Sequence, residues 1–151
     1  MDFCTLHSSK PRSAAPKYTP LFFSDEASAL AAGHRPCAQC RRDRFVRFGE
    51  AWSRALGSTG RAMAPEIDRV LHRERLRGAK RRRVDLEALP VGAFIAGGCG
   101  AAFQVVGPSK IARWRGDAYE TAVTPDWGEG FTLLTPPSTV AALRAGYSPE
   151  T

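Results

Sequence analysis

The sequence lacks long hydrophobic runs and contains little histidine and cysteine, and these shortages narrow what the chain can be. No apolar segment approaches the roughly 18 residues needed to cross a bilayer, so no membrane partner is expected. Asp2, Cys4 and His7 stand where a secretory signal would have its apolar core, which predicts a cytoplasmic protein. In that reducing compartment, cysteines in close pairs are more often metal ligands than disulfides.

Acidic residues are scarce in the first part of the chain. The formal net charge is +7 at pH 7. Residues 1–83 contain 18 Lys and Arg against 8 Asp and Glu, whereas residues 84–151 contain 4 against 7. This asymmetry favours a polyanion as the partner of the first part, with DNA expected and RNA compatible with the same charge. The alternative is a basic surface that only keeps the protein soluble.

Thiolate and imidazole donors occur in two short pairs, separated by roughly 30 residues. Cys4 and His7 form the first pair, and Cys37 and Cys40 form the second. Four donors of these types meet the ligand count of a closed tetrahedral zinc site. One Zn²⁺ is therefore the expected cofactor, bound by Cys4, His7, Cys37 and Cys40. The alternative is a redox disulfide between Cys37 and Cys40, with the first pair in an ordinary loop.

A basic amphipathic helix is expected directly after the second donor pair. Apolar residues recur at helical spacing from Phe45 to Leu56, which predicts a helix over residues 41–56 with this stripe in the core. The other faces of that helix are rich in arginine and are expected to contact phosphates; an ordinary solvated face is the alternative. The arginines expected to bind nucleic acid here and in the preceding turn are Arg35, Arg41, Arg42, Arg44 and Arg47.

Two further helices are expected in the first part of the chain. Ser24 is the expected N-cap of a short helix over residues 25–32, and Gly33 ends it. Pro65 is well placed to begin a second helix, which ends near Arg77. A compact basic run then predicts electrostatic contact with phosphates, without base specificity. It consists of Lys80, Arg81, Arg82 and Arg83.

Strand signals dominate the second part of the chain. Short apolar or alternating segments, separated by glycine-rich turns, cover residues 92–96, 101–106, 110–115 and 131–135. Ser138 is expected to cap a closing helix over residues 139–145. Trp114 lies between two arginines and is a candidate base-stacking residue, with a half-buried strand aromatic as the alternative.

These signals together predict an α+β fold. A small zinc module with basic helices precedes a small antiparallel β-sheet or barrel that carries one C-terminal helix. The expected units are the zinc module over residues 1–57, a basic helical linker over residues 58–83 and a β-rich domain over residues 84–151. The Gly-Ser-Thr-Gly sequence at residues 57–60 marks the first boundary.

The segment FFSDEASALAAGHRPCAQC, residues 22–40, together with Phe3-Cys4, resembles the N-terminal zinc domain of Ada, the bacterial adaptive-response methyltransferase. In that family an Ala-rich helix leads into a Gly-aromatic-Arg-Pro-Cys-x-x-Cys turn. The resemblance covers about residues 3–48. It implies zinc binding, DNA binding through phosphates, and repair of methylphosphotriesters by irreversible methyl transfer to a zinc-bound cysteine.

Residue by residue, the resemblance puts the methyl acceptor at Cys4, two later ligands at Cys37 and Cys40, and the turn arginine at Arg35. His7 is the departure, since the family's second ligand is a cysteine one position later. Three thiolates and an imidazole leave the zinc site less negative than four thiolates do. Each thiolate is then a poorer nucleophile, so methyl transfer to Cys4 is expected to be slow.

The expected function is therefore that of a zinc-dependent DNA-binding protein of repair or regulatory type. One alternative is a DNA-modifying or repair enzyme, acting by methyl transfer to Cys4 or as a nuclease or glycosylase. Nuclease or glycosylase activity would use acidic groups of residues 117–129 near Tyr119, or His72 with Glu74, as the general acid or base. Another alternative is a protein-interaction adaptor in which zinc only stabilises a small core.

Overall fold

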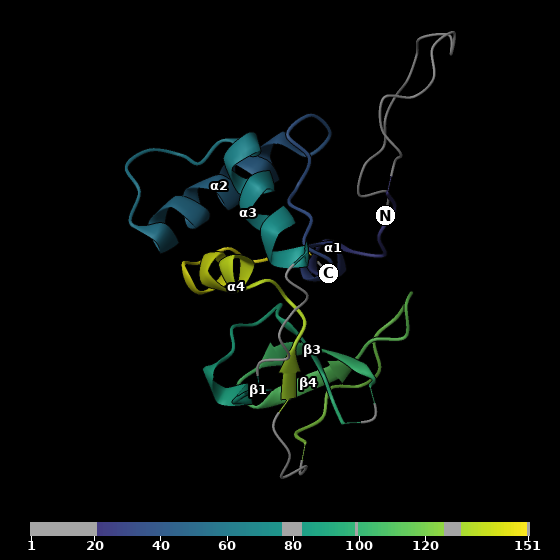
Figure 1. The fold of residues 1–151 in the computed structure, drawn as a ribbon. Coiled ribbons are helices and arrows are strands. Elements are labelled where there is room, and N and C mark those ends of the chain that lie inside the picture. Colours follow the sequence, from purple (N-terminus) through teal and green to yellow (C-terminus); the bar gives the residue numbers. More distant parts are fainter. Residues whose placement is uncertain (1–20, 77–82, 99, 126–130, 151) are drawn as a thin grey trace, which may run out of the picture.

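The computed structural model describes residues 21–76, 83–98, 100–125 and 131–150, and it has the α+β fold predicted from the sequence (Figure 1). The helices are α1 (Glu26–Ala31), α2 (Arg42–Leu56), α3 (Ala64–Leu76), the short 3-10 helix η1 (Leu86–Ala88) and α4 (Pro137–Arg144). The strands are β1 (Arg83–Val84), β2 (Phe94–Ala96), β3 (Ala102–Gly107), β4 (Lys110–Arg113) and β5 (Phe131–Leu133). Within the described ranges, no helix is both long and apolar enough to span a membrane.

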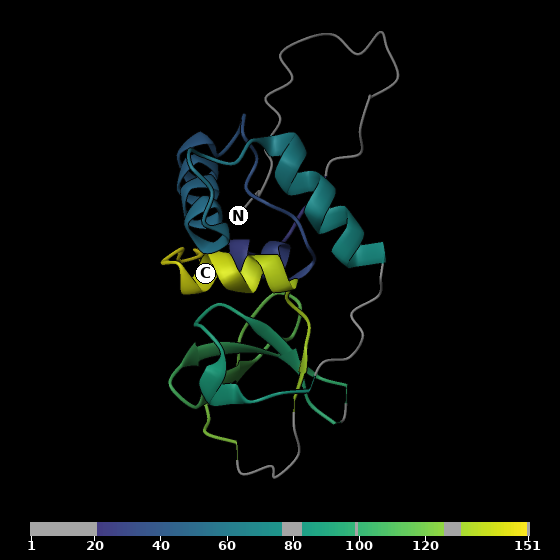
Figure 2. The same cartoon turned by 60° about the vertical axis from the view of Figure 1, so that its left-hand side comes forward.

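The helices and the sheet form separate layers, with α4 between them. Figures 1 and 2 show α1, α2 and α3 on one side of α4 and the sheet on the other. The sheet has five strands in the order β1-β5-β2-β3-β4, and every neighbouring pair is antiparallel. The central strand β2 pairs with both β3 and β5, so Ile95 lies between Phe103 and Leu133. The antiparallel sheet and the C-terminal helix agree with the sequence-based prediction.

Glycine-containing turns connect the strands where the sequence predicted them. The loop after β2 is closed by backbone hydrogen bonds from Gly97 N–H to the Ala101 carbonyl, 3.0 Å, and from Gly100 N–H to the Gly97 carbonyl, 2.9 Å. Gly100 has a φ of 77°, a conformation that glycine adopts without strain. The β3–β4 register shifts between Val105 and Gly107, and this irregularity leads into the turn at residues 107–110 between the two strands.

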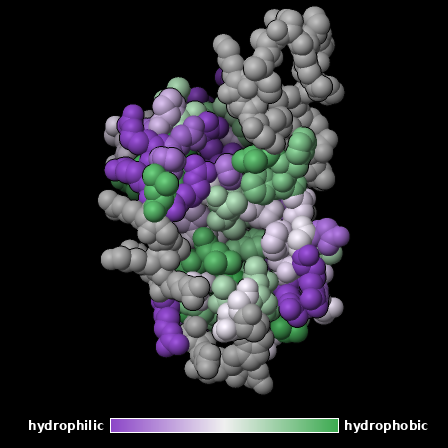
Figure 3. All heavy atoms as spheres, turned by 45° about the vertical axis from the view of Figure 1, so that its right-hand side comes forward, coloured by the Kyte–Doolittle hydropathy of each residue, from purple (hydrophilic) through white to green (hydrophobic). Residues whose placement is uncertain are grey.

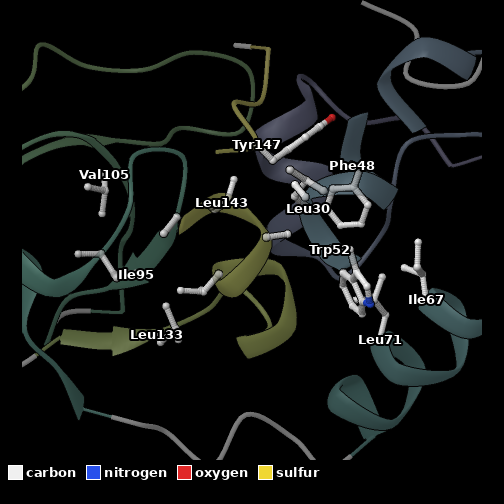
Figure 4. Packing of buried hydrophobic residues seen from close by; sticks show 14 of the residues in the cluster. Leu30, Phe48, Trp52, Ile67, Leu71, Ile95, Val105, Leu133, Leu143 and Tyr147 are labelled. Carbon is white, nitrogen blue, oxygen red and sulfur yellow. The ribbon is translucent and has the colours of Figure 1, made fainter. Parts of the chain in front are cut away.

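A single hydrophobic cluster joins the helices to the sheet (Figure 4). In the helical layer, Phe48 and Trp52 from the predicted apolar stripe of α2 are fully buried, with ring centroids 5.6 Å apart. Leu56, the last residue of that stripe, is 52% exposed because α2 ends there and Gly57 takes a left-handed conformation. On the other side of α4 the cluster continues through the sheet residues labelled in Figure 4, which are Ile95, Val105 and Leu133.

The segment after β5, which includes α4 and Tyr147, contributes to the hydrophobic cluster that the helices and the sheet share. α4 packs on α2, and Tyr147, just beyond α4, meets the Phe48 ring edge-on with centroids 5.1 Å apart. The chain therefore returns from the sheet to complete the helical core. The division into three units at residues 57 and 83 stays a prediction.

Two predicted helix caps were wrong, and one strand was missed. Asp25, rather than Ser24, caps α1, because its side chain accepts the Ser28 N–H at 2.6 Å and forms a capping box. Ser138 lies inside α4 rather than before it, and its hydroxyl donates to Glu74 at 2.6 Å, so tertiary contact replaces the capping role. Strand β1 has only two residues, too short for an alternation to show in the sequence.

Candidate metal and nucleic-acid site

The turn between α1 and α2 presents the two described cysteines. α1 ends at Ala31, and Gly33 follows with a φ of 79° that turns the chain toward the buried Pro36. The Cys37 sulfur then accepts backbone N–H groups of Gln39 at 3.4 Å and of Cys40 at 3.5 Å. Hydrogen bonds to sulfur favour the thiolate over the thiol, which is the form that binds a metal. Both cysteines are partly exposed.

The two cysteines of this turn, Cys37 and Cys40, are of the donor type that zinc prefers. Cys4 and His7, the other predicted ligands, lie outside the described residues. Among residues 21–76, 83–98, 100–125 and 131–150, no group of three or more potential metal ligands occurs. Two thiolates need further donors to close a tetrahedral site. Zinc binding by Cys4, His7, Cys37 and Cys40 therefore stays a prediction, as does methyl transfer to Cys4.

Arg35 joins the cysteine turn to α3. Its guanidinium pairs with both carboxylate oxygens of Asp68, through Nε and one terminal nitrogen, each at 2.8 Å. The same group lies over the Phe45 ring, 5.1 Å from the centroid. An ion pair on one side and an aromatic ring below together hold the planar guanidinium in one orientation. Arg35 therefore positions the turn, and a phosphate contact by Arg35 has to compete with Asp68.

A second contact between α3 and the turn surrounds His34. Arg75 donates to the Gly33 carbonyl at 3.2 Å and lies 3.4 Å from Nε2 of His34, whose ring also packs on Phe23. Burial, and then the positive charge of Arg75, lower the pKa of His34, while Asp68 acts weakly in the opposite direction. The imidazole is therefore kept neutral at pH 7, and it serves the packing of the turn.

Beneath the turn lies a buried polar cluster centred on Glu26. Its side chain has no exposed surface, and its carboxylate accepts hydrogen bonds from Arg44, from the Tyr147 hydroxyl at 2.5 Å and from the Glu150 backbone N–H at 2.9 Å. Arg44 also donates to the Ser148 carbonyl and stacks on the Tyr147 ring, 4.9 Å from its centroid. Although burial acts against it, the pKa of Arg44 is raised by Glu26. Arg44 is thus an internal ion-pair partner that holds residues 147–150 against α1 and α2.

Two tyrosines in this region should make stability sensitive to alkaline pH. Burial, followed by hydrogen bonds to Asp25 and Glu26 respectively, raises the pKa of Tyr119 and of Tyr147. A raised folded-state pKa gives stability that is complete below the unfolded value of about 10 and is lost as pH rises toward the folded pKa. We expect the urea midpoint to fall above about pH 10, and to fall less in the Tyr119→Phe, Tyr147→Phe double variant. Equal losses in both proteins would contradict this assignment.

An open hollow beside Cys40 brings together four of the ten residues predicted to contact nucleic acid. Its volume is about 500 Å³, and its lining residues are Gln39, Cys40, Arg41, Arg42, Asp43, Arg44, Arg47 and Glu150. Arg42 and Arg47 are exposed, and neither forms an ion pair with any part of the chain that the structure describes. Arg41 forms an ion pair with Glu150. The hollow therefore contains two guanidinium groups without an ion-pair partner among the described residues, those of Arg42 and Arg47, which we call the uncommitted arginines. The charges of Arg41 and Arg44 are partly neutralised by carboxylates.

The remaining predicted contacts lie elsewhere. Lys80, Arg81 and Arg82 fall outside the described residues, and Arg83 is exposed on strand β1. Trp114 follows β4 in the sheet layer, where its ring meets Phe94 edge-on at 6.0 Å between centroids, so it is a half-buried strand aromatic. The structure thus groups Arg41, Arg42, Arg44 and Arg47 but leaves Arg83 and Trp114 outside the hollow. Base stacking by Trp114 stays a prediction.

Three of the groups considered for an enzymatic reaction, Tyr119, Glu120 and Glu74, have internal partners. Tyr119 donates to Asp25, and Glu120 forms an ion pair with Arg115. Glu74 accepts both the hydroxyl and the backbone N–H of Ser138, so it is unavailable as a partner of the exposed His72. Asp126 and Glu129 lie outside the described residues. No catalytic pairing follows from these contacts.

Glu26 and Glu150 were missed as site residues by sequence reasoning, which treated Glu26 only as a favourable charge in a helix first turn. A signal for its burial was present, because Glu26 lies four positions before Leu30 and shares a helix face with it, among small apolar residues. Glu150 carries no comparable signal in the sequence.

Figure 3 shows hydrophilic side chains gathered over the helical part of one face, above a more hydrophobic band. Comparison of the chain with protein-family models, with curated proteins and with solved structures finds no match. The resemblance to the Ada zinc domain therefore rests on the turn residues themselves and stays a prediction.

Proposed function

We propose that this chain is a zinc-dependent DNA-binding protein of repair or regulatory type, which contacts phosphates through the arginine-lined hollow beside Cys40. The observation that carries this proposal is the placement of Arg42 and Arg47. Both are exposed at the hollow, next to the cysteine turn, and neither has an ion-pair partner among the described residues. Exposed guanidinium groups without internal partners are suited to neutralising phosphates.

The charge of the hollow supports a polyanion rather than an apolar ligand. Four arginines line it against the two carboxylates of Asp43 and Glu150. Such a surface attracts the backbone of a nucleic acid irrespective of sequence. DNA is proposed as the partner on the grounds of the Ada resemblance, and RNA is compatible with the same chemistry.

Zinc would be held by Cys37 and Cys40 together with Cys4 and His7. The support for this ligand set is chemical, since the two N–H groups directed at the Cys37 sulfur stabilise a thiolate. When bound, the ion supplies a cross-link between the N-terminal region and the turn. The position of the turn is set by the chain itself, because the ion pair of Arg35 with Asp68 holds the turn on α3 beside the hollow.

Replacing both uncommitted arginines tests the proposal. The Arg42→Gln, Arg47→Gln variant should bind a short fluorescein-labelled DNA duplex about tenfold more weakly at moderate salt. Its slope of log affinity against log salt should also be smaller by about 2, since two phosphate contacts are lost. Fluorescence anisotropy between roughly 50 and 200 mM salt measures both quantities.

The matched control removes the same charge elsewhere. Arg54 and Arg144 are exposed, and within the described ranges they donate only to the backbone carbonyls of Ala145 and Ala88 respectively. The Arg54→Gln, Arg144→Gln variant should keep most of the affinity for the duplex. If both variants weaken binding equally, the hollow is not the contact surface. If the wild-type protein does not bind the duplex at all, an adaptor role becomes the better description.

A further inference from the structure

Glu150 occupies the arginine-lined hollow in the manner of a bound anion. Its carboxylate forms an ion pair with Arg41, and its other oxygen lies 3.7 Å from Nε of Arg44. A carboxylate and a phosphate use the same guanidinium donors, so both anions compete for one position. Glu150 therefore sits where a phosphate oxygen would meet these two arginines.

The two carboxylates at Arg44 differ in how firmly they are held. Glu26 is fully buried and has several hydrogen-bond donors, whereas the Glu150 side chain is 49% exposed. An ion pair whose carboxylate is half exposed to water is weakened by solvent and by salt. The Glu150 side chain can thus leave the hollow at small cost, whereas Glu26 cannot leave.

The backbone of Glu150 does not have to move when its side chain does. Its N–H donates to Glu26 at 2.9 Å, and its carbonyl accepts the Glu26 N–H at 3.2 Å. Arg44 is likewise kept in place by Glu26 and by the Ser148 carbonyl. Movement of this one side chain would therefore remove its carboxylate from Arg41 and Arg44 without refolding the segment.

We propose that the Glu150 side chain is a built-in competitor for the phosphate position at Arg41 and Arg44, and that a phosphate group of the ligand displaces it on binding. This inference rests on the proposed function, because it assigns the regulation of the same hollow. A phosphate can then take the place of the Glu150 carboxylate beside the exposed Arg42 and Arg47, while Arg44 stays paired with Glu26. In the unbound protein, Glu150 lowers the affinity of the hollow for other anions.

The Glu150→Gln variant should bind the labelled DNA duplex about two- to tenfold more tightly than wild type at low salt, since the competing charge is removed while the backbone contacts remain. Glu120→Gln is the matched control, because Glu120 is an exposed partner of Arg115 in the sheet layer. It should change affinity by less than about twofold. Adding Arg41→Gln to Glu150→Gln should abolish the gain.

A second measurement separates this inference from the proposed function. Nε–Hε NMR signals of Arg41 and Arg44 are followed during titration with inorganic phosphate, with thermal unfolding of each variant as a check on folding. A larger response in Glu150→Gln than in wild type supports competition, even if no duplex binds and the DNA proposal fails. Equal responses to phosphate and equal duplex affinities in the two proteins would overturn the inference, whether or not DNA binds.

Discussion

Replacing Glu26 with alanine is expected to lower the free energy of unfolding by about 3 kcal/mol, because the change removes the fully buried carboxylate that pairs with the partly exposed Arg44. The carboxylate also accepts the Tyr147 hydroxyl and the Glu150 N–H, so three donors lose their acceptor together. Residues 147–150 should then detach from α1. Urea denaturation at neutral pH, followed by circular dichroism, measures the loss.

Two comparisons make this result specific. Glu50 is an exposed glutamate of α2, and Glu50→Ala should change stability by no more than about 0.5 kcal/mol. Glu26→Gln keeps the shape and one acceptor oxygen but not the charge, so its loss should be intermediate. A Glu26→Ala protein as stable as Glu50→Ala would show that the cluster contributes no net stability and that Arg44 finds water instead.

Removal of zinc is expected to have the other large effect. The purified protein should contain about one Zn²⁺ per chain, and a strong chelator should lower its unfolding temperature by many degrees, since the binding free energy of a structural zinc is also folding free energy. Cys37→Ser and Cys40→Ser should each abolish stoichiometric zinc. Metal analysis and thermal unfolding measure these outcomes.

Cys99→Ser provides the control, because Cys99 is not among the predicted ligands, and it should keep full zinc content. A protein without zinc, whose mass is lower than calculated by two hydrogens, would instead indicate a disulfide between Cys37 and Cys40. That result would support the redox alternative and remove the metal from the proposed function. Retention of zinc by Cys37→Ser would show that the ligand set is wrong.

The helices and strands were predictable because their signals are local. The apolar spacing along α2 and the Gly-rich turn after β2 depend only on neighbouring residues, and both elements lie where these patterns placed them. The choice of α1 cap was less certain from the sequence, since Ser24 and Asp25 are both good N-cap residues. Asp25 also accepts a hydrogen bond from the Tyr119 hydroxyl, a residue that is distant from it in the sequence.

The five arginines around the cysteine turn looked equivalent in the sequence, and the structure separates them. Arg35 is paired with Asp68, and Arg44 is paired with Glu26 in the buried cluster. Arg42 and Arg47 stay exposed at the hollow. A charge pattern records how many cations a segment carries, but the partners of each cation come from other elements.

The sequence by itself determined the α+β class, the position of the main helix and strands, the concentration of positive charge in the first part, and the pairs of candidate zinc ligands. Hydrophobic periodicity, turn chemistry and donor type are properties of short segments, so they can be recognised without a fold. Only the tertiary structure decided which arginines remain available to a phosphate. That outcome depends on Glu26, Asp68 and Glu150, which meet their partners only after α1, α3 and the segment beyond α4 have packed around α2.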